Sequence, residues 1–289
     1  LTFDRLLALS DKKQDCDWEY IFVNDGSSDN SGALIEEFCE QFPQFKGIHF
    51  SKNFGHQSAL TAGLDVARGD VICVIDADLQ DPPELLLDMI KELENGANLA
   101  YGQRTERLGD SWFKVHSARL FYRLLSRITE TNIPLDTGDF RAMDKRVADS
   151  VRQMRETHRF MRGMFAWVGF KAVPVYYQRQ PRVAGSTKYT FRKMLKFALD
   201  AVFSFSDVPL KIASYAGMLI FSFGCFGIVF IVLQFLLFGI PISGSPSILC
   251  TVLLLGGFQL LTLGIMGQYI GLIFEQSKNR PLYLVSTTN

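Results

Sequence analysis

The sequence predicts an α/β fold in which a mostly parallel sheet is flanked by helices and is followed by two membrane-spanning helices. Apolar runs alternate with helical patterns from Trp18 to Arg104, and this order is typical of a parallel, helix-flanked sheet. Polar residues directly follow several of the apolar runs, as they do at the ligand-binding edge of such sheets. No charged side chain occurs between Lys211 and Glu275, a stretch far longer than the roughly 20 residues that cross a bilayer once.

The elements are expected in a regular order. A helix covers residues 1–9 and a polar link covers 10–17. Strands are expected at 18–23, 48–50, 71–75 and 97–102, with helices at 31–41, 57–68 and 84–95. The strand 71–75 has five apolar residues, four of them β-branched, which favours a strand buried on both faces of the sheet. The connections between parallel strands should be right-handed.

Two carboxylates stand directly after the strand 71–75. Asp76 and Asp78 lie near its carboxyl end, and Gln80 is just beyond them. Carboxylate and amide oxygens around one point suit a hard divalent cation, Mg²⁺ or Mn²⁺, that also holds phosphate oxygens. The plainer interpretation is a solvated acidic turn, but two carboxylates aimed at one point repel each other unless a cation lies between them.

Three further polar residues follow other strands. Asp25, Asn53 and Arg104 each lie at or just past the carboxyl end of a strand, so we expect them to share one edge with Asp76 and Asp78. No G-x-G-x-x-G or P-loop pattern is present, which disfavours a dinucleotide fold or a P-loop. The edge therefore favours a nucleotide held through its diphosphate, with Asp25 accepting a hydrogen bond from the base.

The charge-free stretch divides into two spans. The turn-rich segment 241–246 separates apolar runs at about 212–239 and 247–274. Two buried helices of a soluble protein are the alternative, but a soluble helix normally keeps a polar face. Basic residues flank the outer ends, whereas the loop between the spans carries none, so the positive-inside rule places the polar domain and both termini in the cytoplasm. Glycines in the spans allow close helix packing, within the hairpin or between protomers of a homo-oligomer.

These patterns divide the chain into four parts. We expect a cytoplasmic catalytic domain at 1–187, juxtamembrane amphipathic helices at 188–211, the two spans within 212–274 and a cytoplasmic tail at 275–289. Lys plus Arg and Asp plus Glu number 30 each, so the overall charge gives no indication of nucleic-acid binding. The five cysteines show no paired or metal-ligand spacing, which agrees with a reducing compartment.

Two basic amphipathic stretches are candidates for contact with the lipid surface. The first covers 112–128 and carries Arg119 and Arg123, and the second covers 188–205 and leads into the first span. Such patterns indicate contact with a membrane surface or an anionic lipid. For the first stretch, a helix packed on the sheet with a solvated basic face is the alternative. We expect residues 158–162 to add to this basic surface, and we interpret His56 as an ordinary polar contact.

Five segments together carry a family resemblance. They are VNDGSSD (23–29), SKNFGHQSALTAG (51–63), DADLQDPPE (76–84), DTGDFRAMD (136–144) and RVAGSTKY (182–189). In this order they resemble the inverting GT-A glycosyltransferases of family 2 that act on polyprenyl phosphates, namely dolichol-phosphate mannose synthases and bactoprenol glucosyltransferases. The two spans and the segment Asn279–Tyr283 are more similar to the bacterial bactoprenol glucosyltransferases.

The resemblance implies a role for each motif. Asp25 would contact the nucleotide base, while Asp76, Asp78 and Gln80 would hold the metal and the diphosphate. Asp139, an acid after a glycine turn, would stand where the family has its proposed catalytic base. The residues expected on the phosphate and acceptor side are Arg182, Ser186 and Lys188 of a covering loop, together with Arg119 and Arg123.

The resemblance also implies the reaction. A hexose, glucose from UDP-glucose, would move to a polyprenyl phosphate with inversion, at the cytoplasmic face of a bacterial inner membrane. Because a phosphate monoester is largely ionised at neutral pH, Asp139 would chiefly position the phosphate or a proton. The alternatives are the same chemistry with GDP-mannose or another nucleotide sugar, and a non-catalytic sugar-nucleotide-binding subunit.

The sequence departs from the family pattern at its start. The family usually opens with a strand that ends in a Pro-x-Tyr-Asn-Glu-like turn, and we expect such a strand ahead of Leu1, because a sheet without its central strand has unpaired edges. Asn24 stands where an Asp is common; it keeps the acceptor oxygen and loses the charge. The Gln-x-x-Arg-Trp signature of processive polysaccharide synthases is absent, which argues against repeated chain extension.

Overall fold

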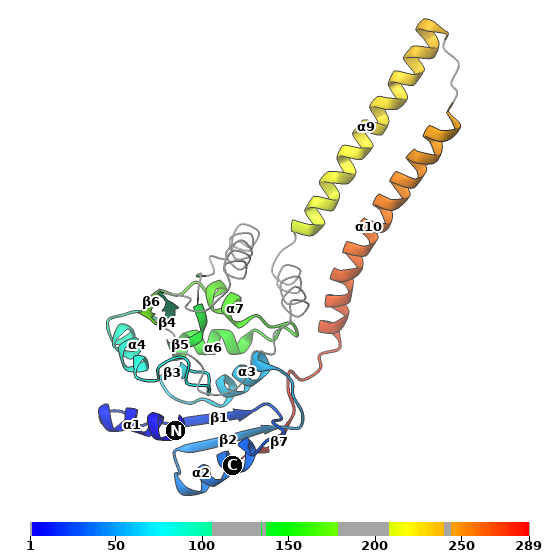
Figure 1. Ribbon diagram of the computed structural model, residues 1–289. Helices are drawn as coiled ribbons and strands as arrows, with labels where there is room; N and C mark the ends of the chain where they lie inside the picture. The colour runs from blue at the N-terminus through cyan, green and yellow to red at the C-terminus, as the bar shows by residue number, and fades with distance from the viewer. Residues whose placement is uncertain (1, 106–133, 135–136, 179–207, 240–243, 289) are drawn as a thin grey trace. The chain divides into compact units, whose positions relative to one another are not determined.

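The computed structural model describes residues 2–105, 134, 137–178, 208–239 and 244–288. The chain forms two compact units, one of Leu1–Leu195 with Arg280–Asn289 and the other of Lys196–Asn279. The first unit contains sheets flanked by helices, and the second contains two long helices (Figure 1). The helix-flanked α/β fold predicted from the sequence is confirmed.

The first part of the α/β unit alternates helices and strands as expected. The helices are α1 (Thr2–Lys12), α2 (Ser31–Gln41), α3 (His56–Val66) and α4 (Leu85–Glu94), and the strands are β1 (Tyr20–Asn24), β2 (Phe45–Phe50), β3 (Val71–Val74) and β4 (Leu99–Arg104). The apolar stripe of each helix explains its place. In α4, for example, Leu86, Met89 and Ile90 are spaced as neighbours on one helix face and are all buried.

The strands form two mixed sheets, with the orders β1-β2-β7 and β3-β5-β4-β6. The later elements are β5 (Thr137–Asp144), α6 (Lys145–Gln153), α7 (Met161–Trp167), β6 (Ala172–Tyr177) and β7 (Val285–Thr288). The pairs β1–β2 and β4–β6 are parallel, whereas β5 is antiparallel to both β3 and β4, and β7 is antiparallel to β2. The segment that the sequence suggested as a glycine turn with an acid is therefore a buried antiparallel strand.

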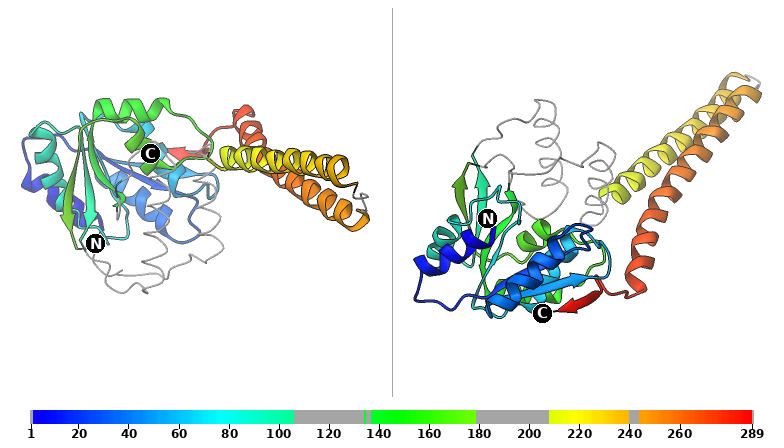
Figure 2. Two further views of the ribbon diagram at one scale, coloured as in Figure 1. Left: turned by 90° about the horizontal axis from the view of Figure 1, so that it is seen from above. Right: turned by 60° about the horizontal axis from the view of Figure 1, so that its bottom comes forward.

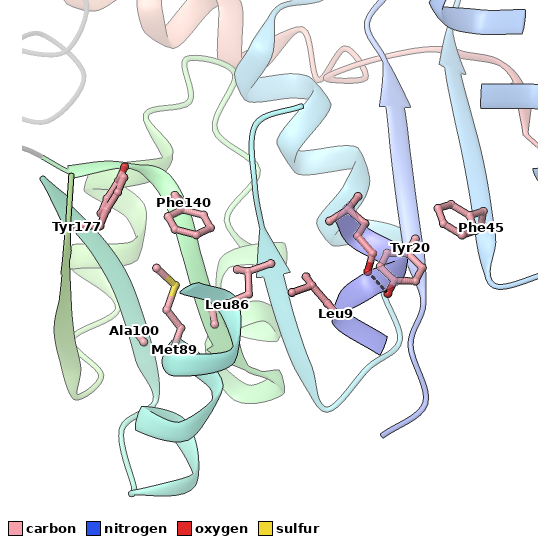
Figure 3. Packing of buried hydrophobic residues seen from close by; sticks show 10 residues of the cluster. Leu9, Tyr20, Phe45, Leu86, Met89, Ala100, Phe140 and Tyr177 are labelled. Carbon is pink, nitrogen blue, oxygen red and sulfur yellow. Dashed lines mark hydrogen bonds between the residues drawn. The ribbon is translucent and has the colours of Figure 1, made fainter. Parts of the chain in front are cut away.

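One apolar cluster connects the two sheets. Its members come from α1, α4 and both sheets and include Leu9, Tyr20, Phe45, Leu86, Met89, Ala100, Phe140 and Tyr177. Figure 3 shows these side chains spread from Phe45 on one side to Tyr177 on the other. The Tyr20 hydroxyl donates a hydrogen bond of 2.9 Å to the carbonyl oxygen of Leu6, which satisfies the buried polar end of this aromatic residue.

The strands β1 and β3 are edge strands of their respective sheets. Both line a cavity of about 550 Å³, together with parts of α1 and α3. The lining is mostly apolar but includes Asp25, His56 and Asp76. Two unpaired edges along one cavity are what a sheet without its central strand would leave, and the strand expected ahead of Leu1 stays a prediction.

The last strand joins the first sheet. In β7, Val285 pairs with Phe50 of β2, and the Ser286 hydroxyl donates to the carbonyl oxygen of His49 at 2.9 Å. Just before β7, the ring of Tyr283 stacks on Phe50 with centroids 5.0 Å apart, and its hydroxyl donates to Asp65 at 2.8 Å. The residues from Arg280 onward, within the segment expected as a cytoplasmic tail, therefore belong to the α/β unit.

The second unit consists of α9 (Val208–Phe238) and α10 (Ser245–Ser277), which lie side by side (Figures 1 and 2). Both contain stretches long and apolar enough to cross a membrane. A Cβ added at Gly217 of α9 would lie 3.2 Å from the Phe258 ring of α10, whereas at Gly224 and Gly264 it would meet nothing within 4 Å. Gly217 thus permits a close approach of the helices, while the oligomer and the four-part domain division stay predictions.

Replacing Tyr283 should loosen the attachment of β7. We expect Tyr283→Ala to lower the free energy of unfolding by about 1–3 kcal/mol, because it removes the ring packed on Phe50. Tyr283→Phe should cost only about 1 kcal/mol, since it removes the hydrogen bond to Asp65 alone. Thermal unfolding of the full chain in detergent measures both, with the exposed Tyr176→Ala as a control. Equal losses in the Ala and Phe variants would contradict the packing role of the ring.

Candidate active site

Antiparallel pairing brings two strand ends to one edge of the second sheet. In the β3–β5 ladder, Val74 lies opposite Arg141. Continuing that register by two residues places Asp76, just past β3, opposite Asp139 near the start of β5. The imidazole of His56 is near both side chains, with Nε2 2.9 Å from Asp139 Oδ2 and 3.8 Å from Asp76 Oδ1. The edge therefore brings together two of the predicted site residues.

Asp139 is a buried carboxylate among positively charged groups. Its side chain is 3% exposed, and besides His56 it contacts Arg162 Nε at 3.2 Å and Arg141 Nη2 at 3.6 Å. Burial alone would raise the pKa of Asp139, but the His56 hydrogen bond and the charges of Arg162 and Arg141 outweigh it and hold the pKa well below its usual range. Asp139 is therefore ionised at neutral pH, and its low proton affinity makes it a poor general base.

Arg141 fixes the backbone around Asp139. Its Nε donates to the carbonyl oxygen of Asp139 at 3.2 Å, and its Nη2 donates to that of Gly138 at 2.9 Å. The guanidinium lies over the ring of Phe165 in α7, 4.2 Å from the centroid. Burial lowers the pKa of Arg141 to about 10, which still leaves it charged at neutral pH. The backbone that carries the Asp139 carboxylate is thus held in place by the hydrogen bonds and packing of Arg141.

The pKa values of His56 and Asp76 are both raised, for different reasons. The hydrogen bond to Asp139 raises the pKa of His56, burial opposes this, and Asp76 adds to the rise. Burial raises the pKa of Asp76; His56 opposes this, while the negative charges of Asp139, Asp81 and Asp78 raise it further. Negative charge therefore accumulates at the end of β3, and His56 offsets part of it.

The segment after Asp76 forms a tight turn. Asp78 Oδ1 accepts a hydrogen bond of 3.2 Å from the backbone N–H of Gln80, and Leu79 between them has a left-handed φ of 56°. Gln80 is 8% exposed and Asp81 is 1% exposed. The turn is therefore held by the side chain of Asp78, as is usual for an Asp that bonds the backbone two residues on.

Arg104 lies in a second polar cluster, beside Asp81. The Tyr177 hydroxyl donates to Asp81 and accepts from Arg104 Nε, which lies 3.3 Å from it. Arg104 Nη2 is 3.8 Å from Asp81 Oδ1. Burial, aided by Asp81, raises the pKa of Tyr177 to about 12. A Cβ at Gly138 would lie 2.9 Å from Arg104 Nη2, so the glycine next to Asp139 makes room for this arginine.

Asp25 holds the loop that precedes α3. Its Oδ1 accepts the backbone N–H of Phe54 at 2.6 Å, and its Oδ2 accepts that of Gly55 at 2.9 Å. In return, Asn53 Nδ2 donates to the carbonyl oxygen of Asp25 at 3.0 Å. Asp25 and Asn53 are thus brought together as expected, in mutual contacts that shape the loop. Their contact with a nucleotide stays a prediction.

Two further contacts explain the shape of the turn after β1. Gly26 has a φ of 65°, and a Cβ there would lie 2.5 Å from the carbonyl carbon of Lys52. Asn24 accepts the Ser27 N–H at 2.9 Å, and its Nδ2 lies 3.2 Å from Nδ1 of the buried His49. An Asp at position 24 could accept the first bond but has no N–H for the second, which gives a physical reason for Asn here.

The donor set at the end of β3 fits a divalent cation. Asp76, Asp78 and Gln80 can supply oxygen ligands, and the pKa of Asp76 is raised by burial first and by the neighbouring negative charges of Asp139, Asp81 and Asp78 second. Within the described part of the chain, no three His, Cys, Asp or Glu side chains are close enough to form a metal site alone. A cation held by one or two carboxylates would take further ligands from substrate phosphates and water, as Mg²⁺ commonly does.

The structure changes the interpretation of the basic residues. Arg119, Arg123, Arg182, Ser186 and Lys188 lie outside the described residues. The prediction that 158–162 adds to a basic surface is wrong for two members, because Arg159 is 9% exposed and Arg162 faces Asp139. Both were assigned from charge alone.

Sequence reasoning also missed His56, Arg141, Arg162 and Asp81 as members of the polar clusters. One signal was available for His56. It is the first residue of α3, which follows β2 after a short loop, and a helix N-terminus commonly meets ligands.

Comparison with known proteins gives consistent matches. The profile of the family described as Glycosyl transferase family 2 matches residues 2–152. An uncharacterized glycosyltransferase of Bacillus subtilis (strain 168) is 48% identical over 98% of this chain and 88% of its own length. The bactoprenol glucosyl transferase of Shigella phage SfV is 38% identical over 92% of this chain and 87% of its own length.

Gly26→Ala should disrupt the loops that carry Asp25 and Asn53. The added methyl group would meet backbone atoms that cannot move alone, in a conformation that L side chains rarely adopt. We expect a loss of about 1–3 kcal/mol in the free energy of unfolding. Gly63→Ala is the matched control, because its Cβ would make only an ordinary contact of 3.6 Å with Val23. An equal effect of both substitutions on thermal unfolding would argue against the close loop contact.

Asp139→Asn should reduce stability in a pH-dependent way. Removing the charge leaves Arg141 and Arg162 without their buried partner, which should cost about 3 kcal/mol at neutral pH. Because the folded-state pKa of Asp139 is lowered, its contribution is present above the unfolded value near 3.9 and is lost as the pH falls below it. Denaturation at pH 7, 5 and 3.5 measures the difference from wild type, which should shrink toward the lowest pH. A constant difference would contradict an ionised Asp139.

Proposed function

The chain belongs to glycosyl transferase family 2 and is a glycosyltransferase, and from this premise we propose that it moves a hexose from a nucleotide sugar to a polyprenyl phosphate. The preferred donor is UDP-glucose. One observation carries the choice of acceptor and sugar, namely the 38% identity over 92% of the chain with a bactoprenol glucosyl transferase. The site at the ends of β3 and β5 then has to hold a sugar diphosphate and a lipid phosphate together.

The donor side of this proposal is the turn after β3. Asp76, Asp78 and Gln80 would hold Mg²⁺ or Mn²⁺, and a bound cation would neutralise the diphosphate as it leaves. The loops fixed by Asp25 and Asn53 would receive the nucleoside, since they lie at the ends of β1 and β2. Arg104 reaches the start of β5 beside Gly138 and would add positive charge near the diphosphate.

The reaction is a single in-line displacement. An oxygen of the acceptor phosphate attacks the anomeric carbon of the sugar, and the bond from that carbon to the nucleoside diphosphate breaks on the opposite face. The configuration is inverted. Asp139 does not need to remove a proton, because much of the acceptor phosphate is already a dianion at neutral pH. The protein contributes chiefly alignment and electrostatic stabilisation.

In this proposal, the apolar helices anchor the enzyme in the membrane that contains the lipid acceptor. A polyprenyl phosphate stays in the bilayer, so an enzyme anchored there by α9 and α10 meets it at a high local concentration. We infer a location in the bacterial inner membrane with the active site in the cytoplasm, from the basic residues that flank the spans. Arg182, Ser186, Lys188, Arg119 and Arg123 are proposed to face the phosphates of donor and acceptor.

The purified full-length protein tests the function directly. In detergent with Mg²⁺ and undecaprenyl phosphate, we expect UDP-glucose to give a glucosyl lipid, detected by mass spectrometry of the extracted product. Parallel reactions contain GDP-mannose and other nucleotide sugars, and one lacks metal and contains a chelator. Transfer from another donor only would reject the sugar assignment, and absence of any lipid product would reject the proposed function.

The substitution Asp78→Asn tests the negative charge of the proposed donor site. The amide oxygen of Asn can still accept the Gln80 N–H and keep the turn, whereas the negative charge for a cation is lost. We expect turnover to fall at least about 100-fold, with an unchanged melting temperature. Asp88→Asn removes an equivalent charge from an exposed ion pair on α4 and should leave turnover unchanged. If the Asp78 variant keeps wild-type turnover at saturating donor, Asp78 does not take part in the donor site.

A further inference from the structure

His56 lies between the two halves of the site. Its Nε2 is the donor to Asp139 at 2.9 Å and lies 3.8 Å from Asp76. We propose that His56 is a positioning residue that holds Asp76, the donor-side carboxylate, in a fixed orientation relative to Asp139. This role rests on the proposed function, because it assigns Asp76 to the donor and its cation.

The anchor behind His56 is rigid. Asp139 is 3% exposed and is bonded to His56 and Arg162, while Arg141 bonds the backbone on which it stands. The side chain of Asp76 is less restrained than that of Asp139, since it is 34% exposed. At 3.8 Å, the approach of Nε2 to Asp76 is longer than a hydrogen bond, so the imidazole restrains the more mobile Asp76 by lying beside it.

The backbone of His56 is also held on both sides. Before it, the carboxylate of Asp25 accepts the N–H groups of Phe54 and Gly55. After it, Gln57 Oε1 accepts the backbone N–H of Met161, at 2.8 Å, where α7 begins. The imidazole therefore projects from a helix start that cannot shift without breaking these contacts.

His56, unlike Asp139, is among the residues that line the cavity with Asp25 and Asp76. Its side chain is 49% exposed. The imidazole therefore lies between the buried Asp139 and the partly exposed Asp76. Removing the imidazole should free Asp76 to turn away from Asp139, because the two carboxylates repel each other.

Two substitutions separate this role from a purely structural one. His56→Leu removes both contacts, and we expect kcat to fall about 10- to 100-fold, the usual range when a partner that orients a ligating carboxylate is lost. The KM for the lipid acceptor should change less than about threefold. His56→Gln keeps an N–H donor of similar reach and should recover most of kcat. Gln41→Leu, at the exposed end of α2 and outside the cavity lining, is the control.

A double-mutant cycle tests the coupling. If His56 acts together with Asp139, the variant His56→Leu with Asp139→Asn should be no slower than the slower single variant, whereas independent roles give additive losses. Calorimetry of UDP with Mn²⁺ gives a readout without turnover, and His56→Leu should weaken this binding about 10-fold.

The outcomes distinguish this proposal from the proposed function. A wild-type chain that transfers sugar to the lipid, with His56→Leu unchanged in kcat and in UDP affinity, overturns the positioning role alone. Additive losses in the cycle, or failure of His56→Gln to recover activity, also overturn it. A wild-type chain that makes no lipid product overturns the proposed function, and the UDP measurement then still decides whether His56 orders Asp76.

Discussion

The site depends on one electrostatic constraint, the meeting of Asp76 and Asp139 at the ends of antiparallel strands. Because one imidazole nitrogen lies 2.9 Å from one carboxylate and 3.8 Å from the other, the oxygens involved are less than about 7 Å apart, and at an effective dielectric near 20 their charges repel by at least about 2 kcal/mol. His56, Arg162 and Arg141 offset this repulsion on the Asp139 side. On the Asp76 side, burial first and the neighbouring carboxylates second outweigh the effect of His56, and the pKa of Asp76 is raised.

The first turn of α3 connects the parts of the fold that surround this pair. Residues 54 and 55 bind the carboxylate after β1, His56 binds Asp139 of β5, and Gln57 binds the first residue of α7. A few consecutive residues thus fix a loop, a strand and a helix that are distant in sequence. The close backbone contact at Gly26 has the same effect, since it locks the loops after β1 and β2 together. The site is therefore preorganised by backbone contacts as much as by side chains.

The sequence was sufficient to predict the helices and strands up to Arg104, because apolar periodicity and turn residues are local signals. It was also sufficient for the meeting of Asp25 and Asn53, which follow the neighbouring parallel strands β1 and β2. Asp139 was named only through the family resemblance, because its position depends on β5 pairing antiparallel between β3 and β4, a non-local choice. The contacts of Arg162 and His56 with Asp139 could not be predicted for the same reason. Their partners lie 23 and 83 residues away, and no local pattern indicates such contacts.

The state of Asp139 bears on which acceptor suits this site. A hydroxyl acceptor must lose its proton as the sugar is transferred, so it calls for a base with a pKa near the working pH. Asp139 is buried among His56, Arg162 and Arg141, and the resulting low pKa makes it a weak base. A phosphate acceptor has no such requirement, because it is already largely ionised at neutral pH. The same positive groups that make Asp139 a weak base keep it ionised, so that it can accept the hydrogen bond from His56. The charge environment of Asp139 is thus a physical argument for a phosphate acceptor over a hydroxyl, independent of the similarity to other proteins.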